Sequence, residues 1–164
     1  ALHLALMSSE NRMASALGRH YPGGRSAFIR AMNNKARQLG MRNSRFYDST
    51  GLSTRNVSTA RDLAKLITAA YRQPLIRQFT QDTNKEMRFS TPAYSLMFNN
   101  TNPLVKNPDW DVRLSKTGYT DEAGRCLLMR AKPDRQELAI VLLNSVGKRT
   151  PIGDANRIRK WLKS

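Results

Sequence analysis

Three strands are expected within residues 112–144, which read VRLSKTGYTDEAGRCLLMRAKPDRQELAIVLLN. Apolar or alternating runs cover Val112 to Thr117, Arg125 to Ala131 and Glu137 to Asn144, and short polar connections separate them. Runs of this length, bounded by turn residues such as Gly, Asp and Pro, are typical of strands that are joined by hairpins. This stretch therefore predicts an antiparallel meander of three strands.

Two amphipathic helices are expected ahead of the meander. Residues Ser26 to Leu39 place apolar side chains at helical spacing, and Gly40 follows them as a stop signal. Ser58 and Thr59 can cap a second helix that runs to about Tyr71. We expect the apolar stripe of the first of these helices to lie in the core.

Shorter elements complete the expected order. A short helix over Arg12 to Leu17 would be closed by Gly18. A final helix over Asp154 to Leu162 would pack on the sheet, with Trp161 among its inward side chains. Between the helices and the meander, residues 86–98 contain only short strand-like pieces.

The chain length and the order of elements limit the architecture. With 164 residues, the chain has the usual size of one domain or part of one. The order of helices, then sheet, then helix predicts an α+β fold, mainly helical over residues 1–85, with the sheet and a closing helix over 86–164. No apolar stretch approaches the roughly 20 residues that span a bilayer, and Ala1 to Met7 lacks the features of a signal peptide.

The charge is strongly basic, since 28 Lys and Arg residues outnumber 12 Asp and Glu residues and give a net charge of +16. A field of that size attracts polyanions. The basic residues are scattered, however, without a block or a nucleic-acid-binding signature. We therefore expect a generally basic surface and no nucleic acid as partner. A basic nucleic-acid-binding module is the alternative hypothesis.

The residues available for metal or thiol chemistry are few. Cys126 is the only cysteine, and His3 and His20 are the only histidines, so the chain contains no Cys and His ligand set for zinc. Cys126 lies in an apolar run and is expected to be a buried small hydrophobe. We expect neither a metal nor another cofactor.

Two short motifs bear groups that suit acyl transfer. Ser9-Glu10-Asn11 lies in an expected turn between helices, and Lys116-Thr117-Gly118 lies at the end of an expected strand. A hydroxyl beside a cation, such as Ser9 near Lys116, can relay a proton and stabilise negative charge. In a simpler interpretation, Ser9 and Asn11 cap the next helix and Lys116 is a solvated lysine.

The remaining residues of these motifs suit substrate binding. The Asn11 amide can both donate to and accept from a peptide backbone, and Thr117 can offer its hydroxyl to a substrate carboxylate. Gly118 would let a substrate lie flush against the strand. The backbone N–H of Tyr119 could point at a developing oxyanion.

The stretches around both motifs resemble the low-molecular-mass penicillin-binding proteins of the D-alanyl-D-alanine carboxypeptidase family, and most closely its DD-endopeptidase branch. The resemblance rests on MSSEN at 7–11, FIRAMNNKA at 28–36, FYDSTGL at 46–52, STARDL at 58–63, NTN at 100–102 and KTGYTDEAG at 116–124. It extends over essentially the whole chain.

The resemblance implies a β-lactamase/transpeptidase-like α+β fold. It also implies a penicillin-sensitive serine DD-peptidase that cleaves peptidoglycan peptides through an acyl-serine intermediate, is blocked by β-lactams and needs no metal. The implied location is the bacterial periplasm, with peripheral contact to membrane or cell wall. The residues that match the family's site are, for catalysis, Ser9, Asn11 and Lys116, and, for substrate binding, Thr117, Gly118, Tyr119 and Arg149.

The family's first motif, Ser-x-x-Lys, carries its nucleophile and is expected upstream of Ser-x-Asn. The only Ser-x-x-Lys in this chain is Ser145-Val146-Gly147-Lys148, which follows Lys-Thr-Gly at a strand end and is interpreted as coincidence. We therefore expect the nucleophile to lie outside this chain, in a missing N-terminal part, and the chain alone to be inactive. A catalytically inactive wall-binding homologue is the third hypothesis.

Overall fold

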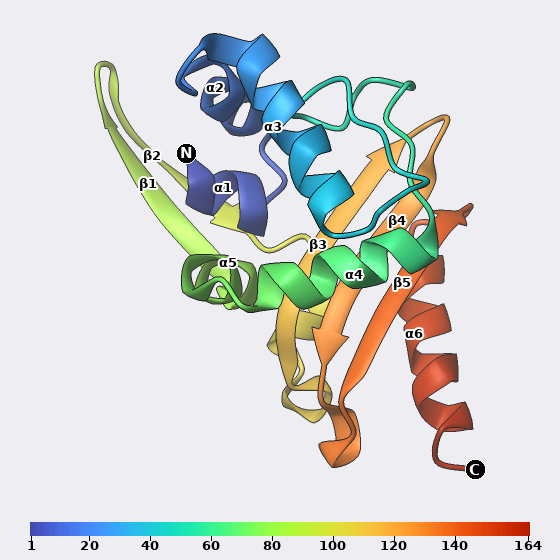
Figure 1. Ribbon diagram of the computed structural model, residues 1–164. Coiled ribbons are helices and arrows are strands. Elements are labelled where there is room, and N and C mark those ends of the chain that lie inside the picture. The colour runs from blue at the N-terminus through green and yellow to red at the C-terminus, as the bar shows by residue number, and fades with distance from the viewer.

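A computed structural model describes residues 1–164, and it confirms the α+β class (Figure 1). The helices are α1 (Leu2–Met7), α2 (Asn11–Arg19), α3 (Gly24–Gln38), α4 (Ala60–Tyr71), α5 (Pro74–Gln81) and α6 (Thr150–Trp161). The strands are β1 (Asn84–Ser90), β2 (Ala93–Asn99), β3 (Val112–Thr120), β4 (Gly124–Ala131) and β5 (Leu138–Ser145). Three short 3₁₀ helices are η1 (Pro103–Lys106), η2 (Pro108–Trp110) and η3 (Pro133–Arg135). None of the helices is long and apolar enough to cross a membrane.

The three strands predicted from residues 112–144 form an antiparallel sheet in the order β3-β4-β5. β3 extends to Thr120, past its predicted end at Thr117. The register places Lys116 opposite Leu128 and Gly118 opposite Cys126. Because β3 is an edge strand, its other side is free of strand partners along the Lys-Thr-Gly segment.

The largest apolar cluster lies between this sheet and α6. Its buried members are Leu104, Trp110, Val112, Leu127, Met129, Ala131, Ile140 and Ala155. Trp110 is the largest of these and is 0% exposed. Its indole Nε1 donates to Oδ1 of Asn156 at 3.1 Å, so the one polar atom of the ring is paired with α6.

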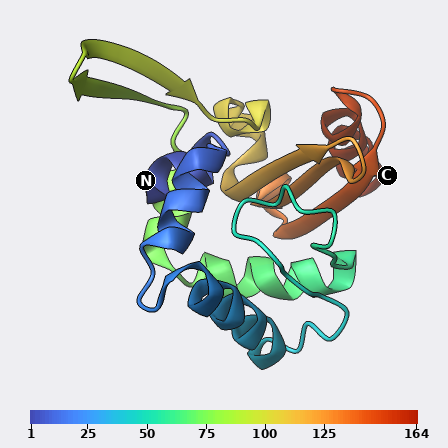
Figure 2. The same cartoon turned by 90° about the horizontal axis from the view of Figure 1, so that it is seen from above.

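α4 and α6 lie on opposite faces of the sheet (Figures 1 and 2). Alternate residues of a strand point to opposite faces, so Met129 and Ala131 face α6 while Arg130 faces α4. The guanidinium of Arg130 lies 4.0 Å from the ring centroid of Tyr71, at the end of α4. As predicted, Thr59 caps α4, accepting a hydrogen bond from the backbone N–H of Asp62 at 3.2 Å.

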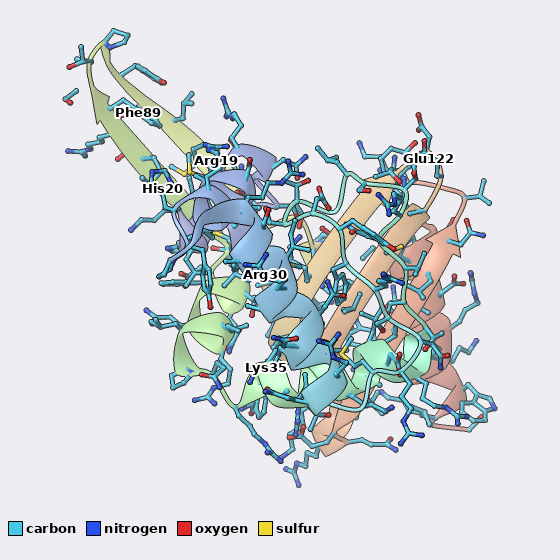
Figure 3. The ribbon with its side chains drawn as sticks, turned by 45° about the horizontal axis from the view of Figure 1, so that its top comes forward. Arg19, His20, Arg30, Lys35, Phe89 and Glu122 are labelled. Carbon is cyan, nitrogen blue, oxygen red and sulfur yellow. The ribbon has the colours of Figure 1, made fainter.

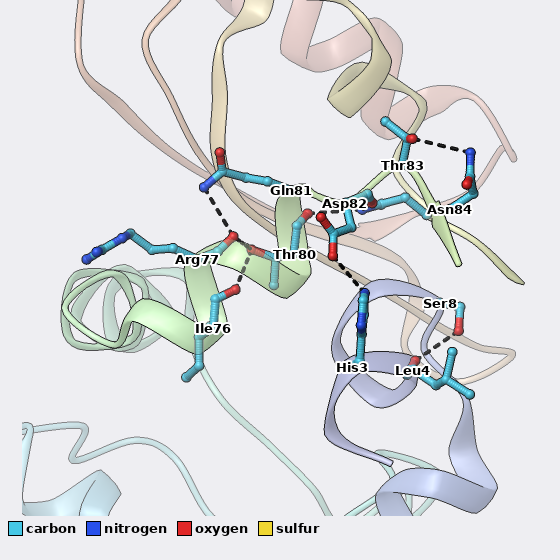
Figure 4. Close-up of polar contacts among 11 residues, drawn as sticks. His3, Leu4, Ser8, Ile76, Arg77, Thr80, Gln81, Asp82, Thr83 and Asn84 are labelled. Atoms are coloured by element: carbon cyan, nitrogen blue, oxygen red, sulfur yellow. Dashed lines mark hydrogen bonds and ion pairs between the residues drawn. The ribbon is translucent and has the colours of Figure 1, made fainter. Parts of the chain in front are cut away.

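α1 is joined to α5 by an aromatic contact and by a polar contact, and Figure 4 shows the polar contact in close-up. The His3 ring stacks on Phe79 with 4.3 Å between ring centroids. Its Nε2 lies 2.8 Å from Oδ2 of Asp82, directly after α5. This contact holds α1, and with it the loop that carries Ser9, against the helix that packs on β3.

The strand-like pieces expected in residues 86–98 are one long hairpin, β1 paired with β2. It projects away from the rest of the molecule (Figures 1 and 2). Phe89, marked in Figure 3, stacks on Tyr94 with 4.6 Å between centroids. Because both strands lack a partner on their outer edges, most of the hairpin is exposed and its residues contribute nothing to the core.

Two predictions about helix ends and faces are wrong. Gly18 does not close α2 but lies buried inside it, where a Cβ would come within 2.8 Å of the Ser49 hydroxyl. Trp161 is 72% exposed, whereas Ala155 in the same helix is 0% exposed. Six residues at 3.6 per turn place Trp161 about 240° around α6 from Ala155, so the two cannot share a face.

Two predictions about burial also need correction. Of the apolar stripe in α3 only Ala36 is buried, and Phe28 lines a cavity instead of the core. Cys126 is half-buried and lines the same cavity, because the β3–β4 register places it opposite Gly118. Phe28 and Cys126 therefore each face a cavity that local sequence does not reveal.

Candidate active site

A cavity of about 870 Å³ opens where the α1–α2 loop, the edge of β3 and the start of α6 meet. All of the predicted site residues line it: Ser9, Asn11, Lys116, Thr117, Gly118, Tyr119 and Arg149. They come from three separate parts of the chain. The fold therefore brings together the two motifs that lie 107 residues apart in sequence.

Ser9 is held in an unusual backbone conformation in the α1–α2 loop. Its φ of 55° lies in the left-handed region, which non-glycine residues rarely adopt. The loop is fixed on both sides of it, because Ser8 Oγ donates to the Leu4 carbonyl at 2.9 Å and the Glu10 N–H donates to the same carbonyl at 3.2 Å. This geometry turns the Ser9 side chain toward β3.

The simpler interpretation of Ser9 and Asn11 as helix caps is wrong. Glu10 is the N-cap residue of α2, and its carboxylate accepts the backbone N–H of Arg12 at 3.0 Å. Asn11 is the first residue of α2 and lines the cavity. Because Glu10 caps α2, the Ser9 hydroxyl is free to contact β3.

The Ser9 hydroxyl meets Lys116 across the cavity. Lys116 Nζ donates to Ser9 Oγ and also to the Thr117 carbonyl at 2.6 Å, and Ser9 Oγ donates to that carbonyl at 3.3 Å. No carboxylate pairs with the ammonium group. Burial without a counter-ion lowers the pKa of Lys116 from its ordinary value of 10.5 to about 8.

The strand beneath these groups is supported by a buried amide. Asn102 Nδ2 donates to Ser115 Oγ at 2.8 Å, and its Oδ1 accepts the N–H of Leu104 at 3.0 Å. The neighbouring Thr101 hydroxyl accepts a hydrogen bond from Thr117 Oγ1 at 2.5 Å. The Asn-Thr-Asn stretch at 100–102 therefore fixes both the edge strand β3 and the Thr117 hydroxyl. Nothing specific in the sequence indicated the contact between Thr101 and Thr117.

Gly118 and Tyr119 form the open end of the strand. A Cβ at Gly118 would have no neighbour within 4 Å, so the space beside it is free. Tyr119 is exposed, and its hydroxyl donates to Asp121 Oδ1 at 2.6 Å, which raises the pKa of the phenol. The guanidinium of Arg125 lies 4.2 Å from the centroid of the Tyr119 ring.

The charge that lines the cavity is entirely positive. Lys116, Arg125, Lys148 and Arg149 line it, and no Asp or Glu does. Arg149 lies at the start of α6, where a turn closed by a hydrogen bond from the Thr150 N–H to the Gly147 carbonyl brings it beside β3. Arg125 and Lys148 were not predicted, because in sequence each resembles an ordinary surface cation.

The opposite end of the cavity is apolar. Leu2, Leu6, Ala14, Leu17 and Phe28 line it. The cavity therefore has a cationic end at the sheet and an apolar end between the helices. Of the Ser145-to-Lys148 tetrapeptide, Ser145 ends β5 and only Lys148 lines the cavity, so this Ser-x-x-Lys does not bring its serine to the site.

Comparison with solved structures defines the class of fold. The Streptomyces K15 DD-transpeptidase is 26% identical with a TM-score of 0.88, over 98% of this chain and 65% of that one. Penicillin-binding protein D2 from Listeria monocytogenes, in its cefotaxime-bound form, is 24% identical with a TM-score of 0.81, over 96% of this chain and 63% of that one. The fold is that of the DD-peptidases and DD-transpeptidases.

Sequence comparison defines the family. Residues 1–147 match the family described as D-alanyl-D-alanine carboxypeptidase, and the chain belongs to that family. It is 50% identical to the D-alanyl-D-alanine endopeptidase of Pseudomonas aeruginosa and 51% identical to that of Escherichia coli, in each case over 163 residues and 99% of this chain. The match covers 53% of each relative, so the chain spans about half the length of these curated relatives.

Proposed function

We propose that the protein is a penicillin-sensitive serine DD-peptidase that cleaves peptidoglycan peptides through an acyl-serine intermediate. The observation that carries this proposal is the contact between Ser9 and Lys116 in a cavity without acidic residues. The endopeptidase names of the two relatives that are 50% and 51% identical to this chain over 163 aligned residues favour cleavage of cross-links over trimming of chain ends. The proposed location is the bacterial periplasm.

In this proposal Ser9 and Lys116 move the proton. As a serine nucleophile attacks the scissile carbonyl, a C–O bond forms and the hydroxyl proton passes to the Ser9–Lys116 pair. When the C–N bond breaks, the pair returns that proton to the leaving amine. A lysine with a pKa near 8 can act in both directions close to neutral pH.

The rest of the cavity suits an anionic peptide. Thr117 and Arg149 would bind the substrate carboxylate, and Asn11 would hold the peptide backbone on the helical side. The free side of Gly118 lets the substrate lie along β3. The Tyr119 backbone N–H is the proposed donor to the oxyanion.

We place the acylated serine outside residues 1–164, with Ser9 as relay. The apolar end of the cavity supports this assignment, since it would pack against a helix that carries the nucleophile beside Ser9. Mass spectrometry of the full-length protein after reaction with a labelled penicillin tests it. We expect one acylated serine in a Ser-x-x-Lys sequence. Label on Ser9 would overturn the relay role, and absence of label would overturn the enzymatic function.

The rate of acylation should rise with pH through about 8, because the Lys116 amine must be neutral before it can accept a proton. In Lys116→Arg this rise should disappear, since a guanidinium stays protonated. The measurement is the acylation rate with a fluorescent penicillin from about pH 6 to about pH 10. Lys35→Arg, on the exposed side of α3, is the control (Figure 3). The same rise in Lys116→Arg would contradict the assignment.

The same pKa shift has a consequence for stability. Between about pH 8 and 10.5, the unfolded chain retains the Lys116 proton that the folded chain has lost. The state with more bound protons is disfavoured as pH rises. The contribution of Lys116 to the free energy of unfolding therefore becomes more favourable as the pH rises through that window.

Gly118→Val should obstruct substrate binding without unfolding the protein. No atom lies within 4 Å of a Cβ at this position, and a β-branched residue suits a strand, so we expect the stability to change by less than about 1 kcal/mol. The added methyl groups would occupy the space of the substrate, and the acylation rate should fall at least about tenfold. Ala139→Val, exposed on β5, is the matched control. Equal acylation rates in both variants would show that substrate does not lie on this edge.

A further inference from the structure

A second groove lies between α3 and the loop that follows it. It has a volume of about 630 Å³ and shares no lining residue with the candidate active site. We call it the arginine groove, and its lining residues are Ile29, Arg30, Asn33, Asn34, Arg37, Met41, Arg42, Ser44 and Arg45. Arg30 and Arg37, two turns apart, stand on the helix wall, and Arg42 and Arg45 stand on the loop wall. Figure 3 marks Arg30 on α3.

The four guanidinium groups of this groove have no acidic partner. None of the ion pairs in the structure includes Arg30, Arg37, Arg42 or Arg45, and no Asp or Glu lines the groove. Arg37 donates to the Asn34 side chain. Arg45 lies 5.3 Å from the centroid of a tyrosine ring. All four are exposed, so each retains donors for a ligand.

The backbone of the loop wall is held in place from two sides. Asn33 of α3 donates from Nδ2 to the Phe46 carbonyl at 2.7 Å and accepts the Phe46 N–H at 2.9 Å. On the other side, the buried Asp62 carboxylate accepts the Asn43 N–H at 2.8 Å and the Ser44 hydroxyl at 2.9 Å. The two walls therefore keep their separation without a ligand, which reduces the cost of ordering on binding.

These features point to an anion with about four negative charges. A phosphate monoester carries about 1.5 to 2 negative charges near neutral pH and can be bound by two parallel N–H donors of one guanidinium. Two such groups would balance the four arginines, and the volume of the groove is in the range of small-molecule sites. A carboxylate carries half that charge, so a dicarboxylate would leave the groove with excess positive charge.

We propose that the arginine groove binds a ligand with two phosphate groups. This site is separate from the proposed peptidase cavity, and the proposal does not depend on the peptidase function. The same chemistry occurs in soluble bisphosphates and in bisphosphorylated lipid headgroups. The gathering of four arginines around one groove with a fixed frame distinguishes this site from the other scattered cations of the surface.

The test is binding of the full-length protein to two probes. Calorimetry with fructose bisphosphate measures a soluble bisphosphate, and co-sedimentation with phosphatidylcholine vesicles that contain phosphatidylinositol bisphosphate measures a surface-bound one. The variant Arg30→Gln with Arg42→Gln removes one cation from each wall, and we expect at least about tenfold weaker binding. The control, Arg72→Gln with Arg135→Gln, removes the same charge from exposed positions elsewhere and should change binding by less than about twofold.

The outcomes separate the sources and the alternatives. Both of the following results require that the groove variant loses the binding. Binding of fructose bisphosphate but not of the vesicles indicates a soluble ligand. Binding of the vesicles, with or without binding of fructose bisphosphate, indicates a lipid headgroup. Equal losses in the groove variant and the control would overturn the proposal in favour of diffuse attraction by the net charge. Absence of binding to both probes would also overturn it, and duplex DNA binding lost only in the groove variant would then indicate a nucleic-acid site.

Discussion

Lys116→Met is expected to slow acylation of the full-length protein by a labelled penicillin by about 10²-fold to 10⁴-fold, the range that a positioned acid–base group contributes. Methionine keeps the length of the apolar stem but cannot accept or donate the proton. Because the lysine is partly buried and pairs with no carboxylate, its removal leaves no unpaired charge behind. We therefore expect the free energy of unfolding to be unchanged or slightly higher.

A matched series separates catalysis from charge. Lys35→Met removes one positive charge from an exposed position on α3 and should leave the acylation rate unchanged. If Ser9 and Lys116 act as one relay, Ser9→Ala should reduce the rate, and the double variant should be no slower than Lys116→Met alone. If the fold reductions of the two single variants multiply in the double variant, Ser9 and Lys116 have independent roles. An unchanged rate in Lys116→Met would remove this residue from the mechanism.

Trp110→Ala is expected to lower the free energy of unfolding by about 3 to 5 kcal/mol, the usual cost of truncating a fully buried aromatic side chain. Trp110 is 0% exposed and lies in the cluster that joins the sheet to α6. Its loss would leave a cavity there and would deprive Asn156 of the donor at 3.1 Å. Urea denaturation followed by circular dichroism measures the change.

The second tryptophan supplies the control for this experiment. Trp161 is 72% exposed, so Trp161→Ala should change the free energy of unfolding by no more than about 0.5 kcal/mol. The two variants lose the same atoms and differ only in burial. A comparable loss of unfolding free energy in Trp161→Ala would show that the outer face of α6 is packed against other residues and would contradict the packing described above.

The sheet was predicted from sequence more completely than the helix faces. The three strands of residues 112–144 are where periodicity and turn residues indicated, because each strand is defined by a local pattern. The prediction placed Trp161 on the buried face of α6, and this was wrong. Its apolar character suggested burial, but its position in the helix does not lie on the same face as Ala155. Gly18 was misassigned because its role depends on the approach of Ser49 from a distant loop.

The site was predicted as a set of residues, and its geometry was not. The sequence indicated that Ser9 and Lys116 belong together, through two motifs and the stretches around them. It did not indicate the contacts of Thr101 with Thr117 or the presence of Arg125 in the same cavity. The first depends on the approach of the segment before η1 to the edge of β3, and the second on the register that places Arg125 opposite Tyr119.

By itself, the sequence determined the three strands of residues 112–144, the approximate bounds of α3 and α4, and the net charge, because these depend on side-chain type and on spacing within one element. It also supplied the two motifs from which the acyl-transfer groups are proposed. Tertiary structure alone decided the properties that depend on neighbours distant in sequence. Burial without a counter-ion lowers the pKa of Lys116 to about 8, and packing of the 41–46 loop on α3 gathers four scattered arginines into one groove. Desolvation and the sum of nearby charges arise only when the chain is folded, so no count of residues could have revealed either.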